Sequence, residues 1–538
     1  MTLQRNLLLI TIMCILCIIC QYVNMDFSVY QLSNPQNRQQ LATILTDSLG
    51  KIITVKTDVL SLQINTYGGD IEQALLLPYS NELDSPKPVH LLDSSKEFVY
   101  HAQSGLIGEN GLDNLVNGNR PLYTSKQDIY VLENNQHELL VPLTYTANNI
   151  IYTKTFILKR SDFALTVNYY INNTSTKPLN FMLFGQLKQS MNLPDTFLSN
   201  NLSSSHMFRR IAYSTTYKKY KKYNFKELNK CNLFLNTNIG WIAMLQKYFS
   251  VVWVPFTSGT KNFYASNYDN RHVVVGFKSS PVTIAAGNQS ELQASLWLGP
   301  EIKNRMVNIA KNLDLVVDYG LLRFISQSML YFMKYIHHYI SNWGFSIIII
   351  TFIIRIIMYP ITKSQYTSIA KIRILQPKIS AIRERFLNDK QRQNQEIIAL
   401  YNKENINPLS SLLPMLIQMP IFLALYHVLS NSIELRHASF MLWIHDLSSQ
   451  DPYYVLPIIM GITILLIQNI SHTNNVTKSS RQQKIMTFMP LIFTVFFLWL
   501  PSGLILYYIV NNLVTIIQQQ LIYRGLKKCG FYKTMVKK

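Results

Sequence analysis

The sequence predicts an α-helical membrane protein with several spans and a large β-sandwich domain outside the bilayer. Two observations lead to this fold class. Hydrophobic residues occupy 48% of the 538 positions and charged residues only 15%, which is too apolar for an ordinary soluble protein of this length. The apolar residues are concentrated at the N-terminus and after residue 342, and the stretch between them has the short runs typical of β-strands.

The first predicted element is an uncleaved signal anchor over residues 1–24. Arg5 precedes an apolar run that ends near Val23 and reaches the roughly 17 residues that a spanning helix needs. The end of the run lacks a small-residue cleavage motif. Three of the five cysteines lie in this run, where a metal cluster would lack polar surroundings. We therefore interpret them as apolar filler and predict neither a metal site nor a cofactor.

The β-sandwich is predicted over residues 25–312. Runs such as KIITVKTDVLSLQIN and KYFSVVWVPF alternate in polarity or are rich in β-branched residues, and turn residues separate them. One stretch of this domain, Arg209 to Lys230, is strongly basic and contains interleaved tyrosines, a mixture found in nucleic-acid-binding proteins. A solvated basic loop is the favoured interpretation, because the orientation derived below places the stretch where no nucleic acid is expected.

A change to helical spacing marks residues 313–342. Apolar residues recur three or four positions apart, at Leu321, Phe324, Ile325, Met329, Phe332, Met333 and Ile336. This pattern predicts an amphipathic helix in the membrane interface. A helix packed on the β domain is the alternative.

Five further spans are predicted, which with the anchor makes six: residues 343–360, 409–429, 453–470, 485–500 and 504–523. Several are short and contain proline, as tilted or kinked helices do. Lys and Arg are abundant in the loops 361–408 and 471–484 and in the tail 524–538, whereas the loop after the third span is acidic. The excess of basic residues on the cytoplasmic side places both termini in the cytoplasm and the β domain outside.

The first cytoplasmic loop is predicted to contain a helical hairpin over residues 364–407. Ile372, Leu375 and Ile379 begin a helical repeat, and Asn388 and Asp389 offer a turn before a second repeat. The surface of this hairpin is basic, so it suits either anionic lipid headgroups or ribosomal RNA.

One permanent cation, Arg355, lies in the second predicted span, and none of the six spans contains Asp or Glu. Neutral polar residues are candidates to keep it hydrated: Thr351 and Thr362 on its own face, Gln418, and a stripe at helical spacing formed by Tyr507, Asn511, Thr515 and Gln518. Three interpretations stay open. Arg355 reaches to the headgroups, or binds a small anion in a transporter, or attracts an acidic or polar segment of an incoming polypeptide.

The C-terminal segments resemble a known family. The runs WGFSIIIITFIIRIIMYPITKSQY, NPLSSLLPMLIQMPIFLALYHVL and LWLPSGLILYYIVNNLVTIIQQQ closely resemble the YidC/Oxa/Alb family of membrane protein insertases. The resemblance implies a five-helix insertase core over 343–523 that encloses a positively charged, hydrated groove at Arg355, Thr351 and Tyr508, with Tyr507 beside them. It also implies a hydrophobic slide for the substrate, formed by Met419, Phe422, Phe496 and Trp499.

The family resemblance implies a function as an insertase and chaperone of the bacterial inner membrane, not as an enzyme. The implied partners are nascent membrane proteins, the Sec translocon with its accessory subunits, anionic lipids, and the ribosome and signal recognition particle through the basic loops and tail. The outer domain is then a periplasmic β-supersandwich without a catalytic site. Two other functions remain possible from the residues: a small-anion transporter and a passive scaffold for membrane assembly. The stretch from Arg209 to Lys230 is more basic than the family leads us to expect.

Overall fold

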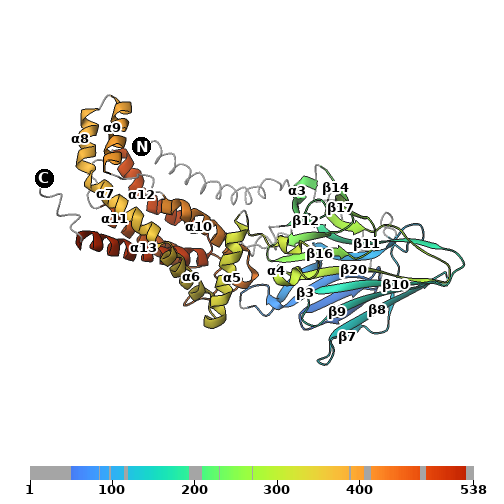
Figure 1. Ribbon diagram of the computed structural model, residues 1–538. Helices are drawn as coiled ribbons and strands as arrows, with labels where there is room; N and C mark the ends of the chain where they lie inside the picture. Colours follow the sequence, from blue (N-terminus) through green and yellow to red (C-terminus); the bar gives the residue numbers. More distant parts are fainter. Residues whose placement is uncertain are drawn as a thin grey trace, which may run out of the picture. The chain divides into compact units, whose positions relative to one another are not determined.

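The structure is a computed structural model that describes residues 50–528 except 84, 96–97, 114–118, 149, 193–208, 229–230, 269–270, 321, 387–388, 405–412 and 473–479. The anchor predicted for residues 1–24 and the tail from residue 529 therefore lie outside the described residues. Strands dominate the first part of the described chain, and helices dominate the second (Figure 1).

One sheet contains eleven strands within the described residues, in the spatial order β14-β17-β18-β11-β5-β4-β3-β2-β1-β7, with β19 paired to β11. The strands are β1 (Ile52–Lys56), β2 (Leu60–Asn65), β3 (Asp70–Ser80), β4 (Pro88–Ser94), β5 (Val99–Ile107), β7 (Ile129–Val131), β11 (Leu179–Ser190), β14 (Leu233–Thr237), β17 (Lys261–Tyr268), β18 (His272–Lys278) and β19 (Val282–Ile284). All pairings are antiparallel except that of β1 with β7.

The other sheet contains nine described strands in the order β13-β12-β15-β16-β20-β10-β9-β8-β6. They are β6 (Thr124–Ser125), β8 (Glu138–Ala147), β9 (Ile150–Lys159), β10 (Ala164–Asn173), β12 (Arg210–Ser214), β13 (Lys221–Asn224), β15 (Trp241–Gln246), β16 (Phe249–Pro255) and β20 (Gln289–Pro300). Strand β10 shows the alternation that builds the core, because every second residue from Leu165 onward is buried. Trp253 of this sheet contacts Phe277 of the other at a ring distance of 6.0 Å. The prediction of a β-rich domain is confirmed.

A buried network of charged groups lies between the two sheets. The ammonium group of Lys154 in β9 donates to the backbone oxygens of Gly68, Gly69 and Ser104, at 3.0, 2.7 and 3.1 Å. Arg120 forms ion pairs with Asp70, at 2.8 Å, and with Asp113. Every member of this cluster has a hydrogen-bonding or ionic partner, as a buried polar group requires.

In the described chain, helix α3 follows β13, and all later helices follow β20. They are α3 (Phe225–Leu228), α4 (Lys303–Met306), α5 (Arg323–Ile340), α6 (Trp343–Ile357), α7 (Tyr359–Ile374), α8 (Gln376–Arg385), α9 (Lys390–Lys403), α10 (Leu413–Asn431), α11 (Val455–His472), α12 (Ser480–Phe497) and α13 (Ser502–Lys528), with 3-10 turns η2 (Leu313–Val316) and η4 (Ile433–Leu435). The helix expected from residue 313 begins only at Arg323. Asn312 and Gly320 have positive φ angles of 64° and 65°, which interrupt a helix before that point.

The chain bends sharply between α6 and α7. Asn342 caps α6, because its side-chain oxygen accepts from the amide of Phe345 at 3.2 Å. The helix ends just before Pro360, which has no amide hydrogen to donate. Among the described residues, no single helix is both long and apolar enough to cross a bilayer, whereas the bent pair Trp343–Ile357 and Tyr359–Ile372, at 62°, passes that test jointly.

Helix α13 is the centre of the helical part. It packs against α6, α7, α10 and α11, and α11 also packs against α12. Helix α5 packs against α6 and α10, and the hydroxyl of Ser326 donates to the backbone oxygen of Ala424 at 3.2 Å. Helices α8 and α9 contact each other, and a small separate cluster with Leu375 and Ile379 at its centre lies there. Residues of three separate segments, α6, α10 and α13, are thereby brought to one place.

Candidate functional site

Arg355 is held by neutral oxygens of α13. Its Nε donates to Oδ1 of Asn511 and its Nη2 to the hydroxyl of Thr515, both at 2.6 Å, with a longer contact of 3.4 Å from Nη2 to the backbone oxygen of Asn511. Only 8% of the residue's surface is exposed. Among the described residues, no carboxylate forms an ion pair with it, and Nη1 donates to no acceptor although it is not fully buried.

The third helix of the site, α10, contributes Gln418. The side-chain amide of Gln418 donates to the hydroxyl of Tyr507 and, at 3.4 Å, to Oδ1 of Asn511. Asn511 therefore receives hydrogen bonds from both the arginine and the glutamine. The structure brings four sequence-predicted site residues into one network, namely Arg355, Gln418, Tyr507 and Asn511.

Gln518 supports the backbone of Arg355. Its Nε2 donates to the backbone oxygen of Arg355 at 3.2 Å, close to where α6 ends. The carbonyl groups at the end of a helix lack the usual donors from the next turn. Gln518 thus supplies a donor at the bend, and this hydrogen bond fixes the backbone of Arg355 relative to α13.

Two threonines on the arginine's face of the chain use their hydroxyls on backbone oxygens four residues earlier rather than on the guanidinium. The hydroxyl of Thr351 donates to the backbone oxygen of Ile347 at 2.6 Å, and that of Thr362 donates to Met358 at 3.0 Å. Both residues are buried. Neither hydroxyl forms part of the network around Arg355 within the described residues.

Tyr508 joins the predicted groove to the predicted slide. Its ring lies 5.3 Å from that of Phe422, 4.9 Å from Phe497 and 5.7 Å from Tyr507, all edge to face. The four residues expected to form the slide differ in exposure. Phe422 is buried, Met419 and Phe496 are half-buried, and Trp499 has 55% of its surface exposed.

Thr515, which accepts from Arg355, was predicted from the sequence as part of the polar stripe but not as a site residue. Its position four residues after Asn511, one turn along the same helix face, was the available signal. A second link, from Nδ2 of Asn512 to the hydroxyl of Thr463 at 2.9 Å, joins α13 to α11 and was not anticipated. A lone threonine in an apolar run gives no indication of its partner.

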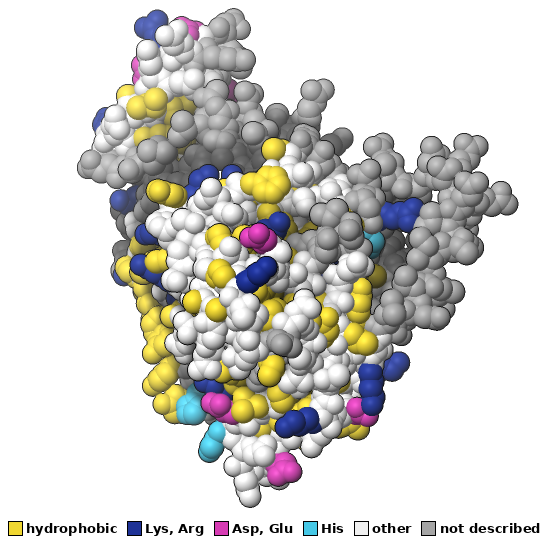
Figure 2. Space-filling model, turned by 90° about the vertical axis from the view of Figure 1, so that its right-hand side faces the viewer, with side chains coloured by type: hydrophobic (Ala, Val, Ile, Leu, Met, Phe, Trp, Pro, Cys, Tyr) yellow, Lys and Arg dark blue, Asp and Glu magenta, His cyan; other side chains and the backbone are white. Residues whose placement is uncertain are grey.

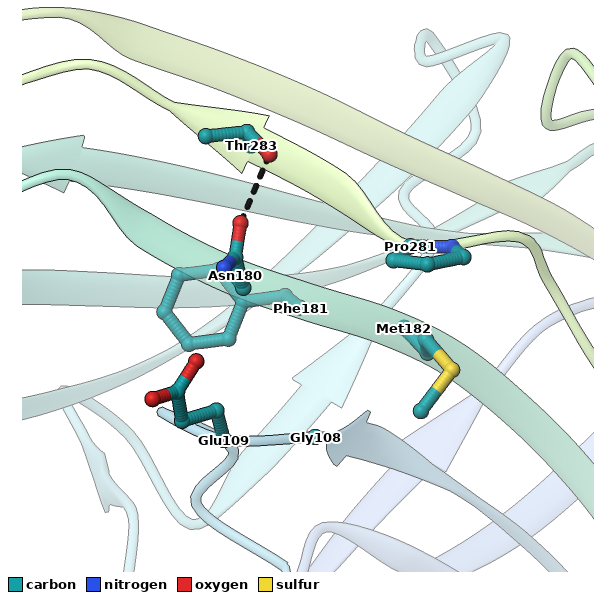
Figure 3. A pocket seen from close by; sticks show the side chains of 7 residues that line it. All are labelled: Gly108, Glu109, Asn180, Phe181, Met182, Pro281 and Thr283. Carbon is teal, nitrogen blue, oxygen red and sulfur yellow. Dashed lines mark hydrogen bonds between the residues drawn. The ribbon is translucent and has the colours of Figure 1, made fainter.

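The β domain offers less chemistry. On the face that Figure 2 shows, charged side chains are scattered among uncharged ones. A pocket of about 440 Å³ lies where β5 ends beside β11 and β19, and Glu109, Asn180, Phe181 and Met182 are among the residues lining it (Figure 3). The side-chain oxygen of Asn180 accepts from Thr283 at 2.6 Å. Among the residues lining this pocket, Glu109 is the one with a titratable side chain.

Family models match nearly the whole described chain. The model described as "60Kd inner membrane protein" matches residues 335–529. The model described as "YidC periplasmic domain" matches residues 52–332, more than half of the chain.

Solved structures that match this chain include an active YidC insertase with its first transmembrane domain resolved. It is 18% identical, with coverage of 88% of this chain and 94% of that one and a TM-score of 0.37. Others match the β domain. A galactose mutarotase-like protein from Clostridium acetobutylicum is 10% identical, covering 47% of this chain and 96% of that one at a TM-score of 0.32.

A putative aldose 1-epimerase from Escherichia coli K12 is 12% identical, covering 46% of this chain and 99% of that one at a TM-score of 0.29. These low TM-scores add no weight to an assignment, which rests on the two family models. The family is one of inner-membrane proteins with a periplasmic domain, and it is not a family of enzymes. The chain belongs to the YidC/Oxa/Alb family of membrane protein insertases.

Proposed function

We propose that this chain inserts newly made proteins into the inner membrane, and assists their folding, through a hydrated groove whose positive charge is Arg355. The observation that carries the proposal is the set of partners around the guanidinium. A buried arginine normally has a carboxylate partner, because desolvating the charge costs several kcal/mol. Here Asn511 and Thr515 supply only neutral oxygens, so the positive charge is not cancelled.

The first step is capture of a polar segment. Among the described residues, Nη1 of Arg355 has no acceptor, and an arginine presents its donors in a planar arrangement that matches a carboxylate. An acidic or polar segment of the substrate completes the hydrogen bonding of the cation for as long as it stays. Gln418, Tyr507 and Asn511 offer further polar groups along the same path.

The second step is release into lipid along Met419, Phe422, Phe496 and Trp499. Each large apolar residue of the substrate gains about 0.3 to 0.6 kcal/mol on entering the bilayer centre. The membrane potential adds roughly 2.3 kcal/mol per charge and 100 mV. Burial of a new helix therefore drives the reaction without a nucleotide. The exposed ring of Trp499 and the buried ring of Phe422 suit the outer and inner ends of such a path.

The proposed topology has six spans, with both termini in the cytoplasm. The spans are the N-terminal anchor, residues 343–360 (α6 with the start of α7), and helices α10, α11, α12 and α13. Residues 364–407, which include the rest of α7 together with α8 and α9, form the proposed cytoplasmic hairpin. Its basic residues and the basic tail meet the ribosome, the signal recognition particle pathway or anionic lipids. The Sec translocon and its accessory subunits are the proposed partners in the membrane.

Helix α5 lies in the outer interface in this topology. One of its faces packs on α6 and α10, and the other exposes aromatic residues, with 85% of Phe324 and 70% of Tyr331 accessible. Aromatic side chains favour the boundary between lipid and water. The domain boundaries that we propose are those expected from the sequence: 1–24, 25–312, 313–342, 343–523 with the hairpin at 364–407, and 524–538.

Reconstitution of the full chain into vesicles tests the function. A short two-span substrate is synthesised in the presence of vesicles that contain only this protein, and insertion is scored by protection from protease. Insertion above that of empty vesicles is expected. Saturable uptake of a small anion by the same vesicles, without substrate insertion, would instead identify a transporter. Absence of both activities would leave a scaffold and contradict the proposal.

A further inference from the structure

The turn between β12 and β13, together with the first residue of β13, presents three exposed lysines in a stretch of sequence without acidic residues. Residues 209–224 contain no Asp or Glu. Lys218, Lys219 and Lys221 are exposed, and Tyr217 at the tip has 89% of its surface exposed. In the part of the chain that the structure describes, no carboxylate forms an ion pair with these lysines. Their charge is therefore available to an external partner.

Hydrogen bonds define the shape of this turn. The amide of Thr215 donates to the backbone oxygen of Lys218 at 2.9 Å, and the amide of Lys218 donates to the hydroxyl of Thr215 at 3.0 Å. The amide of Thr216 donates to the hydroxyl of Thr237 in β14 at 3.1 Å. Strand β13 is the last described strand at its end of the sheet. The lysines are therefore presented from an ordered turn at a sheet edge.

The neighbouring lysine links this turn to the helices. Lys222 forms an ion pair with Asp318, and the backbone oxygen of Asp318 accepts from Nδ2 of Asn431 at 2.8 Å. Asn431 is the last residue of α10. Lys218 is four residues from Lys222, so their Cα atoms are at most about 14 Å apart. The turn is thus close to the outer end of a proposed span and to the segment that leads into α5.

We propose that the β12–β13 turn binds the phosphate headgroups of anionic phospholipids in the outer leaflet of the inner membrane. This inference rests on the proposed topology, in which Asn431 marks the outer end of α10. Lysines act as mobile point charges that attract an anionic surface, and tyrosine rings favour the interface. An exposed turn with three such charges fits a lipid surface better than a single shaped ligand. Contact with lipid would help to hold the β domain beside the membrane while a substrate passes.

The experiment uses the full chain in vesicles, with the five native cysteines replaced and a fluorophore attached through Tyr217→Cys. Nitroxide-labelled headgroups in the lipid quench the fluorophore on contact. Vesicles of phosphatidylcholine alone are compared with vesicles that also contain phosphatidylglycerol. The test variant carries Lys218→Gln, Lys219→Gln and Lys221→Gln. The matched control carries Lys126→Gln, Lys159→Gln and Lys177→Gln, which remove three exposed lysines elsewhere on the same domain.

The proposal predicts stronger quenching in vesicles with phosphatidylglycerol than in vesicles of phosphatidylcholine alone. Added salt should weaken this difference. The test variant should lose it, and the control variant should keep it. Each lysine near an anionic surface strengthens binding roughly fivefold, so loss of three is expected to weaken binding to the anionic surface by about a hundredfold. Equal quenching in both lipids, or in both variants, overturns the inference. So does salt-sensitive cross-linking of the turn to an added acidic protein without any lipid dependence. Substrate insertion is scored in the same vesicles, so failure of the lipid contact with normal insertion leaves the proposed function standing.

Discussion

Nε of Arg355 and Oδ1 of Asn511 are 2.6 Å apart, and this hydrogen bond joins α6 to α13. The acceptor is neutral, so it orients the guanidinium without cancelling its charge. A carboxylate at the same position would do both. With a neutral acceptor the charge of Arg355 stays available to a substrate. With a carboxylate the arginine would form a structural ion pair.

Asn511→Asp tests that difference directly. The new carboxylate is expected to pair with Arg355 at the same distance and to compete with the substrate. Insertion of a substrate with an acidic tail should fall by about tenfold or more, since a close charged hydrogen bond is worth about 1.5 to 3 kcal/mol. The melting temperature should be unchanged or higher, and a substrate with a neutral tail serves as the internal control. Unchanged insertion of the acidic-tailed substrate would contradict the role given to the unpaired charge.

Gln518→Leu tests the support of the bend. The variant removes the donor to the backbone oxygen of Arg355 and should cost about 1 kcal/mol of stability. We expect a larger effect on insertion of acidic-tailed than of neutral-tailed substrates, because the guanidinium loses its fixed orientation. Gln520→Leu, an exposed glutamine on the same helix, is the matched control. Equal losses for the two variants, or for the two substrates, would show that Gln518 does not position the cation.

Lys154 gives the β domain a predictable pH dependence. Burial lowers the pKa of this lysine from its ordinary value of 10.5 to about 7. Between these two values the unfolded chain binds a proton that the folded chain does not. The contribution of Lys154 to the free energy of unfolding should therefore rise as the pH increases from about 7 towards 10.5. Thermal unfolding of the full chain in detergent, followed by circular dichroism of the sheets, measures this slope.

Variants separate the contribution of Lys154 from the rest. Lys154→Met should destabilise the β domain by about 3 kcal/mol, because three backbone oxygens lose their donor and two buried carboxylates lose a neighbouring cation. It should also remove the slope above pH 7. Lys159→Met, at an exposed position of the same strand, should change neither quantity. A wild-type slope that persists in Lys154→Met would rule out this assignment.

Local patterns in the sequence predicted much of the fold. The alternation of buried and less buried residues in β10 and the spacing of polar residues three or four apart in α13 are patterns among residues close in sequence. Such patterns can be read from the sequence, and the structure has both elements near the expected positions. The start of α5 differs from the expected residue 313, because the helical repeat of apolar residues begins only at Leu321 and Gly320 just before it has a left-handed backbone. Element ends depend on such single residues.

Contacts between distant segments could not be predicted in the same way. The stripe on α13 indicated Asn511 and Thr515 as polar candidates, but their pairing with Arg355 spans more than 150 residues of sequence. The cluster of Lys154, Arg120, Asp70 and Asp113 gave no signal at all. Each of its members occurs in a stretch where an exposed charge would be expected, and only the packing of the two sheets buries them together.

The central claim is that an uncancelled positive charge at Arg355 captures the substrate. The most direct measurement compares wild type, Arg355→Lys and Arg355→Ala in the vesicle insertion assay, with substrates whose outer tails are acidic or neutral. We predict that Arg355→Ala abolishes insertion of the acidic-tailed substrate, that Arg355→Lys retains most of it, and that the neutral-tailed substrate is less affected. Equal insertion by all three proteins would contradict the claim and leave the apolar path and the bilayer to perform insertion without the cation.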